Sequence, residues 1–350
     1  MMLIVSLCAK LSVTSCIDAA DLLAARQNAV MRLAKNIWYP VAEGIEIRKK
    51  PRAARRLGMD LVFWRNAAGE VVAQEDRCPH LGASLSLGSI EGDCITCPFH
   101  GLRFDAQGRC TRVPSMGASA SIPEALHART FPTREAQGFV WLWWGDESPS
   151  ANVPFFDEIA SGWTWYTTQV EWPVNYTRAI ENQLDVAHLA FVHRTTIGAG
   201  GRSRVDGPYV QTNHDGIKVW VTNRRDDGAP TRTAEELAAA AAGREPSLHL
   251  LFPGTWKLNI SPGFKNFIAF VPIDEQRMLY YLRSYLPSRW GVLGWLFHRL
   301  TRWSNRLVLG QDRRVVVTQT PANSMDARSD HLVGADRAII EYRKWLAAHL

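Results

Sequence analysis

Between residues 38 and 145, short apolar runs alternate with clusters of Gly, Pro, Asn and Asp. The apolar run 61–64, for example, is followed by the polar segment 65–70 and then by a second apolar pair at 71–72. This pattern is typical of short strands joined by tight turns. The aromatic segment 139–144 closes the pattern and predicts a buried strand. The first part of the chain is therefore expected to be a small all-β module.

A linker containing Pro149, Asn152 and Pro154 precedes a change of pattern at residue 163. Residues 176–192 lack Gly and Pro and carry apolar side chains at helical spacing, so they are expected to form a mostly buried helix. Three apolar runs predict strands of a sheet: 219–221, 267–271 and 278–282. Strands and helices therefore share the second part of the chain.

Two further segments of this second part have patterns of their own. The polar stretch 224–246 contains an alanine run at 238–242 and is interpreted as an insertion loop with one short helix, a candidate lid. Residues 290–309 are amphipathic and aromatic and predict another helix. Its Trp and Leu residues are expected to pack in the core, with a helix in a membrane interface as the alternative.

The composition, with 46% hydrophobic and 21% charged residues, is that of a folded globular protein. Its 350 residues accommodate two domains, which we place at 36–148 and 149–350 after an N-terminal extension or mis-assigned start at 1–35. A formal net charge of +6 is too small and too dispersed for a nucleic-acid footprint. The sequence has no stretch of about 20 uncharged apolar residues, so no transmembrane span is predicted. The N-terminus lacks the basic start of a signal peptide, so we expect a cytoplasmic protein.

Two Cys/His pairs form the first candidate metal site. Cys78 and His80 make one pair, Cys97 and His100 the other, and each pair lies in a turn between apolar runs. Structural zinc is one interpretation, although common zinc modules pair Cys with Cys or His with His. Two matched Cys/His pairs suit a two-iron cluster in which one iron takes both thiolates and the other both imidazoles.

Both stretches, 78–85 and 97–105, resemble the loops of the Rieske [2Fe–2S] family in ligand spacing and flanking glycines. Two departures concern residues that are not ligands. Leu81 stands where the family often has a basic residue, and Leu102 where it often has Trp. The resemblance implies an all-β domain that carries a [2Fe–2S] cluster. Two cysteines match no ligand position and are expected to be packed core thiols: Cys94 and Cys110.

The predicted helix 176–192 and the residue after it carry a second group of candidate ligands. Asp185 and His188 are three residues apart and share a helix face. His193 can rejoin His188 only if the helix ends or bends between them. Two imidazoles and one carboxylate on one face of an iron ion form the facial triad of non-haem oxygenases. Taken alone, however, such residues are satisfied structural groups about as often as ligands.

Together the two motif sets resemble the catalytic subunits of Rieske non-haem iron oxygenases over residues 36–350. The resemblance implies an α+β fold, with an N-terminal all-β Rieske domain followed by a catalytic domain whose antiparallel sheet is flanked by helices. It implies Fe(II) bound by His188, His193 and a late carboxylate, which the stretch 311–316 supplies as Asp312. Glu181, one helical turn before Asp185, is the alternative carboxylate.

The resemblance also implies a role for Asp185. The matching aspartate of the family bridges a ligand histidine of the iron and a cluster histidine of the neighbouring subunit. Electrons would then pass from the cluster through His100, Asp185 and His188 to the iron, across the interface of a homotrimer. Asn182, on the same helix, is a weaker candidate for a catalytic role. A carboxylate that merely caps a neighbouring amide is the structural alternative for Asp185.

The implied reaction uses O2 and electrons from NAD(P)H to hydroxylate or oxidatively demethylate an aromatic or polycyclic small molecule. Because no G-x-G-x-x-G loop is present, a separate reductase or ferredoxin is expected to deliver the electrons. The length resembles the stand-alone homotrimeric members, which favours monooxygenation over dihydroxylation. Five residues are candidates for the substrate pocket: Ile197, Phe252, Trp256, Asn259 and Phe267. The alternative function is electron transfer alone, with a C-terminal ligand-binding or assembly domain.

Overall fold

The computed structural model describes residues 31–230 and 232–350, except for the side chains of residues 292, 293, 295, 296 and 298. Our expectation for residues 1–30 lies outside this range. Residues Arg32–Leu350 form one compact unit by their contacts. The site and the sheets that carry it all belong to this unit.

Short strands build the first half of this unit, as the turn-rich pattern predicts. They form a three-stranded sheet in the order β1-β11-β10 and two four-stranded sheets, β2-β3-β4-β9 and β5-β6-β7-β8, with antiparallel pairing. The bounds are β1 Ile37–Glu43, β2 Arg52–Arg56, β3 Met59–Arg65, β4 Val71–Glu75, β5 Ser89–Glu91, β6 Cys94–Thr96, β7 Arg103–Phe104, β8 Cys110–Arg112, β9 Thr130–Phe131, β10 Thr133–Ala136 and β11 Phe139–Trp144. Short 3-10 turns lie at η1 Gly44–Glu46, η2 Leu85–Leu87 and η3 Pro114–Met116.

The second half is dominated by one antiparallel seven-stranded sheet in the order β12-β18-β17-β16-β15-β14-β13. Its strands are β12 Trp163–Trp172, β13 Arg204–Thr212, β14 Gly216–Arg224, β15 Leu248–Leu251, β16 Thr255–Ser261, β17 Phe264–Asp274 and β18 Arg277–Pro287. The helices are α2 Tyr176–Leu184, α3 Leu189–Val192, α4 Ala234–Ala241, α5 Gly291–Val316 and α6 Arg337–His349. The 3-10 turns are η4 Asp157–Ile159, η5 Ser288–Trp290, η6 Ser324–Asp326 and η7 Gly334–Asp336. The expected α+β class, with helices flanking an antiparallel sheet, is confirmed.

The prediction of one continuous helix over residues 176–192 is wrong. α2 ends at Leu184, and Asp185 has extended backbone angles of φ −68° and ψ 123°. The Asp185 side chain causes this break, because its Oδ1 accepts hydrogen bonds from the amides of Ala187 (2.7 Å) and His188 (3.3 Å). Aspartate often competes with the helix for backbone amides in this way. The chain then makes the single turn of α3 before His193.

The two other predicted helices are present. α4 is the short helix expected in the stretch 224–246, and it begins with a capping box between Thr233 and Glu236. α5 extends beyond the predicted end at residue 309 and carries Asp312 in its last two turns. The expected burial of the Trp and Leu residues over 290–309 is wrong for Leu300 and Trp303, each 72% exposed, and for Trp290 and Leu307, which are 40% and 39% exposed.

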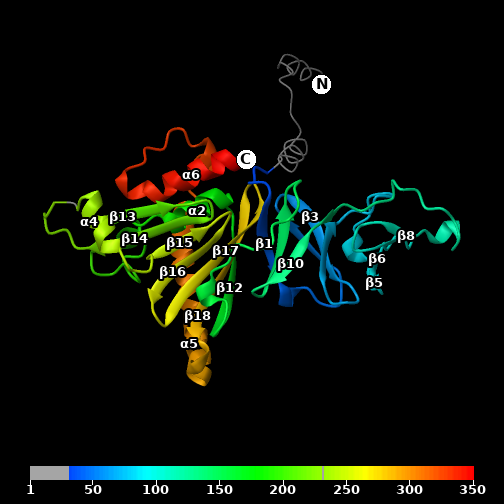
Figure 1. Cartoon of the computed structure of the whole chain (residues 1–350), viewed down its shortest axis with the longest axis horizontal. Helices are drawn as coiled ribbons and strands as arrows, with labels where there is room; N and C mark the ends of the chain where they lie inside the picture. Colours follow the sequence, from blue (N-terminus) through cyan, green and yellow to red (C-terminus); the bar gives the residue numbers. More distant parts are fainter. Residues whose placement is uncertain (1–30, 231) are drawn as a thin grey trace, which may run out of the picture. The chain divides into compact units, whose positions relative to one another are not determined.

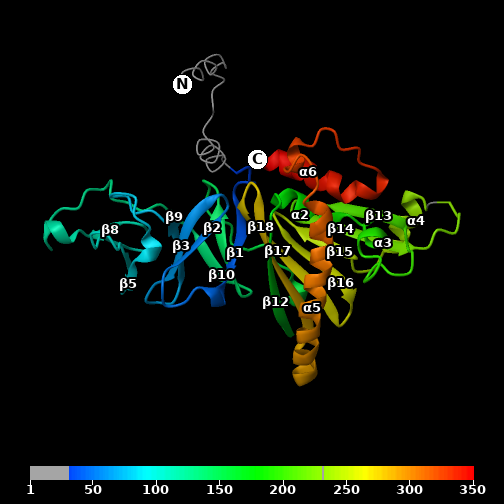
Figure 2. The same cartoon turned by 180° about the vertical axis from the view of Figure 1, so that it is seen from behind.

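The alternation of side chains along β17 and β18 gives the large sheet two different faces. Phe267, Ala269 and Tyr281 point toward β1 and β11, where they share one core with Trp38 and Trp141. The intervening residues point to the opposite face, because side chains alternate along a strand. Figure 1 shows β1 beside β17 of the large sheet, and Figure 2 shows α5 crossing the face of that sheet.

Within the described residues, no helix combines the length and apolar character that a membrane crossing requires.

Candidate metal centres

Two loops of matching geometry hold the first group of predicted ligands. The amide of Cys78 donates to the carbonyl of Ala83 (2.8 Å), and the amide of Cys97 donates to the carbonyl of Leu102 (2.8 Å). Gly82 donates back to Cys78 (2.9 Å). Gly101 likewise donates back to Cys97 (3.1 Å). Both glycines have positive φ angles, 76° and 71°, a conformation that other residues adopt only under strain.

The two loops separate the thiols from the imidazoles. Cys78 and Cys97 are buried side by side, at 1% and 2% exposure, whereas His80 and His100 are exposed. The two imidazole rings lie together, with centroids 4.8 Å apart. This division fits a cluster whose one iron takes two thiolates and whose other iron takes two imidazoles.

The Cys78 thiol is in an environment that suits a metal-bound thiolate better than a free thiol. Burial and the neighbouring Cys97 thiol raise its pKa to about 11, although the amides of His80 and Leu81 donate to its sulfur and oppose this rise. A bound iron ion deprotonates a coordinating thiol, and the two amides would stabilise the resulting charge. The residues present therefore fit a [2Fe–2S] cluster.

Cys94 and Cys110 lie on the sheet β5–β8 and are half-buried. Cys110 packs against the core of this half of the chain, as expected of a packed core thiol. The Cys94 sulfur lies 3.4 Å from Thr111 Oγ1, and the Cys110 sulfur donates to the carbonyl of Arg112 (3.4 Å). Both thiols thus bond locally, to residues of β8.

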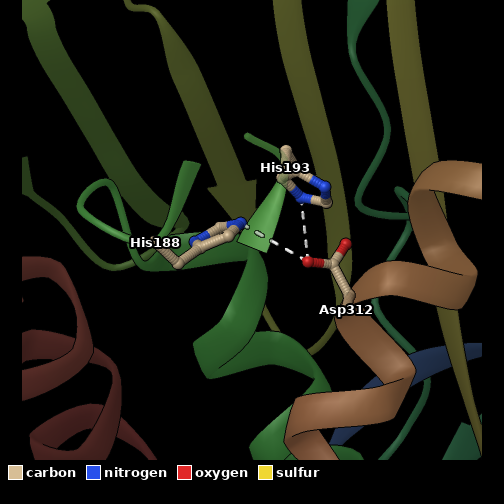
Figure 3. Close-up of side chains that lie close together, drawn as sticks. All are labelled: His188, His193 and Asp312. Atoms are coloured by element: carbon tan, nitrogen blue, oxygen red, sulfur yellow. Dashed lines mark ion pairs between the residues drawn. The ribbon is translucent and has the colours of Figure 1, made fainter. Parts of the chain in front are cut away.

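The second group of predicted ligands converges from the two ends of α3 and from α5. His188 precedes α3, His193 follows it, and Asp312 comes from α5. Figure 3 shows both imidazoles turned toward the same carboxylate oxygen. His193 Nε2 lies 2.9 Å and His188 Nε2 lies 3.5 Å from Asp312 Oδ1. One ligand atom from each of the three residues lies within 4.8 Å of the other two.

This arrangement fits a single metal ion. Donor atoms that share a first-row metal at bond lengths of about 2.1 Å lie roughly 3 Å apart when their bonds are perpendicular. Asp312 is 2% exposed, yet its Oδ1 has no hydrogen-bond partner among the described residues. A buried carboxylate oxygen without a partner is costly, and a metal ion between the three residues would satisfy it.

Each histidine has its own orienting partner. His193 Nδ1 lies 2.8 Å from Gln311 Oε1, which also accepts a hydrogen bond from Thr196 Oγ1 at 2.8 Å. An Nδ1–H that donates to Gln311 leaves Nε2 unprotonated for a metal. Burial lowers the pKa of His193, but Asp312 and Gln311 outweigh it and raise the pKa overall. Sequence reasoning did not identify Gln311 as a partner of His193.

Asp185 is the partner of His188. Its Oδ2 lies 3.5 Å from His188 Nδ1, while its Oδ1 caps the two amides that start α3. Burial alone would raise the pKa of Asp185, but His188 and the two amides lower it overall. The carboxylate therefore both caps amides, as the structural alternative stated, and faces the ring nitrogen of His188.

Glu181 is not part of this group. Its carboxylate accepts two hydrogen bonds from Arg343, at 2.6 and 2.9 Å, and one from Arg178 at 3.3 Å. These buried ion pairs use both carboxylate oxygens, so Glu181 is unsuited to the role of alternative ligand. Asn182 accepts a hydrogen bond from Gln183 (3.0 Å) and lines a separate cavity of about 360 Å³ beside Asp185 and His188.

A mostly apolar cavity of about 390 Å³ opens from the three converging residues into the space between the large sheet and α5. Of the predicted pocket residues, Ile197 and Trp256 line it. Asn259 points to the opposite face of β16, where its side chain binds Lys265 and the carbonyl of Pro246. Phe252 stacks on Trp345 outside the cavity. Phe267 packs in the core on the other side of the sheet.

Sequence reasoning missed two polar residues of the cavity wall, Asn266 and Asn305. Asn266 shares a strand face with Phe264 and Ile268 in β17, and Asn305 shares a helix face with Val308 and Leu309 in α5. A polar residue on an otherwise apolar face was the signal that could have identified them.

Comparisons with known protein families match both halves of the chain. The Rieske [2Fe-2S] domain family matches residues 37–132. The vanillate O-demethylase oxygenase C-terminal domain family matches residues 172–350, which is half of the chain.

Curated relatives are about one-third identical to the chain over the aligned half. It is 37% identical over 194 residues to the putative toluene-4-sulfonate monooxygenase system iron-sulfur subunit TsaM2 of Comamonas testosteroni, covering 54% of this chain and 55% of the relative. It is 33% identical over 195 residues to the oxygenase component of chloroacetanilide N-alkylformylase of Rhizorhabdus wittichii, covering 53% of each. The matches thus span about half the length of these relatives.

Solved structures share the fold over almost the full length. NdmA of Pseudomonas putida CBB5 has a TM-score of 0.71 at 22% identity, covering 92% of this chain and 91% of NdmA. Dicamba monooxygenase bound to dicamba has a TM-score of 0.72 at 21% identity, covering 91% and 97%. With a Rieske domain, three converging candidate metal ligands and the family match over its second half, the chain belongs to the Rieske oxygenases that carry the vanillate O-demethylase oxygenase C-terminal domain.

Proposed function

We propose that this protein is the oxygenase component of a Rieske non-haem iron system. The observation that carries the proposal is the convergence of His188, His193 and Asp312 at one end of an apolar cavity. The buried Asp312 Oδ1 lies 2.9 and 3.5 Å from two imidazole nitrogens. This arrangement suits a mononuclear metal ion, and electron transfer through the Rieske cluster alone does not require it.

Ferrous iron held by these three residues would supply O2 activation when bound, because a facial triad leaves coordination positions open. The protein's own residues orient the two histidine rings and exclude water from the cavity. Gln311 orients the ring of His193 through a hydrogen bond, and the Asp185 carboxylate faces His188 Nδ1 across 3.5 Å. Val186, Leu189 and Trp256 line the cavity and keep bulk water from the reacting carbon.

Electron delivery is proposed to cross between subunits of a homotrimer. In Figures 1 and 2, the sheet β5–β8 next to the cluster loops lies far from α3 and α5 of the same chain. The Asp185 side chain is 29% exposed and faces the 360 Å³ cavity beside His188. This cavity would receive the exposed His100 of a neighbouring subunit, so that electrons pass through His100, Asp185 and His188. Leu81 and Phe99, 65% and 62% exposed at the cluster loops, would be covered there.

The remaining parts of the system follow from the family and the relatives' names. A separate reductase or ferredoxin would pass electrons from NAD(P)H to the cluster, in the cytoplasm. The relatives and the structural neighbours include a toluene-4-sulfonate monooxygenase subunit, a chloroacetanilide N-alkylformylase and dicamba monooxygenase. The names of the two curated relatives support hydroxylation or oxidative demethylation of an aromatic or polycyclic molecule. Domain bounds of 36–148 and 149–350 are part of the same proposal.

Single-turnover chemistry tests the proposal without knowledge of the natural reductase. Protein with a chemically reduced cluster is mixed with ¹⁸O₂ and a panel of aryl methyl ethers, while cluster absorbance and product are followed. The proposal predicts cluster oxidation coupled to a labelled product. In Asp185→Asn, which keeps an oxygen for the α3 amides, cluster oxidation should slow about 10–100-fold with iron retained. Equal rates in the two proteins would contradict the electron path, and absence of product from every ether would contradict the oxygenase.

A further inference from the structure

Three polar side chains form a hydrogen-bonded chain beside the mostly apolar cavity, between α5 and the large sheet. Asn305 Nδ2 on α5 donates to Ser284 Oγ on β18, and Ser284 Oγ donates to Asn266 Oδ1 on β17, each over 3.0 Å. Asn305 and Asn266 line the cavity, whereas Ser284, only 1% exposed, links them from behind. Three different elements thus hold two amide groups in fixed positions.

These hydrogen bonds leave one amide oxygen and one amide nitrogen available to a ligand. Asn305 Oδ1 and Asn266 Nδ2 have no further hydrogen bond among the described residues, and neither is among their fully buried atoms that lack a partner. Turning both amides over would reverse the chain but again leave one acceptor and one donor. A neutral group that both donates and accepts would complement the pair.

The position of Asn305 on α5 sets its distance from the metal ligands. Asn305 and Asp312 are seven residues apart on one helix, so they lie on nearly the same face about 10 Å apart along the axis. Both line the cavity. A molecule that reaches from the metal end to the amide pair is therefore about as long as one aromatic ring with a substituent at each end.

The charge of the cavity excludes an anionic anchor. Among the described residues that line it there is no Lys or Arg, while Asp185 and Asp312 contribute carboxylates at the metal end. A sulfonate or carboxylate at the far end would lose its hydration without gaining a cation. A neutral amide loses less hydration and gains two hydrogen bonds.

We propose that Asn305 and Asn266 bind a neutral carboxamide or lactam group of the substrate, at the end of the molecule opposite to the carbon that is oxidised. The orientation of the substrate in this inference rests on the proposed function, because it places the oxidised carbon at the metal. The binding of the amide group does not depend on that function. It assigns the cavity to an elongated, uncharged aromatic amide, in contrast to the sulfonate in the names of two relatives.

Titration calorimetry tests the assignment by measuring the dissociation constants of three probes of similar shape on the iron-loaded, oxidised protein. The probes are para-methoxybenzamide, para-methoxybenzoate and para-methoxytoluene. The benzamide is expected to bind about tenfold more tightly than either other probe. Asn305→Leu and, independently, Asn266→Leu should lose this preference, while the exposed control Asn152→Leu keeps it. Unchanged cluster absorbance and iron content establish that each variant is folded.

Tighter binding of the benzoate would overturn the proposal, as would equal binding of all three probes or no binding of the benzamide. A preference that survives in both leucine variants would show that the polar chain only ties α5 to the sheet. The readout does not require turnover, so an inactive protein that still prefers the benzamide would contradict the oxygenase but not the amide site.

Discussion

At the scale of single residues, the two candidate iron-binding histidines present the same nitrogen but are oriented by different groups. Gln311 accepts from His193, and Asp185 faces His188. The spacing of Asp185, His188 and His193 was readable from the sequence because these residues are close in the chain. Gln311 could not be assigned, since an amide next to Asp312 acquires its partner only when α5 packs against α3.

We predict that Gln311→Leu weakens iron binding by about 10–100-fold, because His193 Nδ1 loses its acceptor and the ring loses its fixed orientation. Iron retained per chain after dialysis against graded chelator measures this effect. Gln276→Leu, on the exposed turn between β17 and β18, is the matched control. Equal iron retention in the two variants would mean that Gln311 has no part in holding the ring.

At the scale of elements, strand alternation decides which predicted residues reach the cavity. Trp256 and Asn259 lie three positions apart on β16 and therefore point to opposite faces of the sheet. The sequence pattern identified these strands but not which face would meet the cavity. It also merged α2 and α3, because helical periodicity continues across Asp185 although the backbone does not.

Glu181 ties α2 to α6 through Arg343. Glu181→Gln would leave Arg178 and Arg343 with less charge compensation in a buried site, so we predict a loss of about 3 kcal/mol in the free energy of unfolding. Urea denaturation measures the loss, and iron content of the folded variant should match that of the parent. The opposite result, full stability with loss of iron, would restore Glu181 as the ligand carboxylate.

His249 on β15 provides a pH-dependent contribution to stability. Burial and the nearby Lys218 lower its pKa to about 4, whereas Asp215 opposes this effect. The unfolded chain takes up this proton below about pH 6.5, and the folded chain only near pH 4, so stability falls as the pH drops through that range.

We predict that His249→Gln removes about 1–2 kcal/mol of this acid-dependent loss. The difference in unfolding free energy between parent and variant, measured from pH 7 to pH 4.5, isolates the residue from other titrating groups. A difference that does not change with pH would contradict the lowered pKa.

At the scale of the whole described molecule, one aromatic core joins the sheet β1-β11-β10 to the back of β17 and β18. Arg283, only 1% exposed, crosses this junction, with its guanidinium 3.6 Å from the Phe139 ring centroid and 2.7 Å from Glu43. The large sheet therefore faces the first domain on one side and the cavity on the other. The sequence predicted two modules but not this shared core, because the side chains of an aromatic-rich strand do not specify which element will pack against them.

The number of metal sites in the whole protein distinguishes an oxygenase from an electron carrier. Both need the Rieske domain, and only the oxygenase needs a mononuclear iron. Iron and acid-labile sulfide per chain, measured on anaerobically purified protein together with the electron paramagnetic resonance spectrum of the reduced cluster, test this directly. The account predicts about three iron atoms and two sulfides with a Rieske signal, falling to about two iron atoms in Asp312→Ala. About two iron atoms in the parent protein, unchanged after reconstitution with Fe(II), would contradict the mononuclear site and leave an electron carrier.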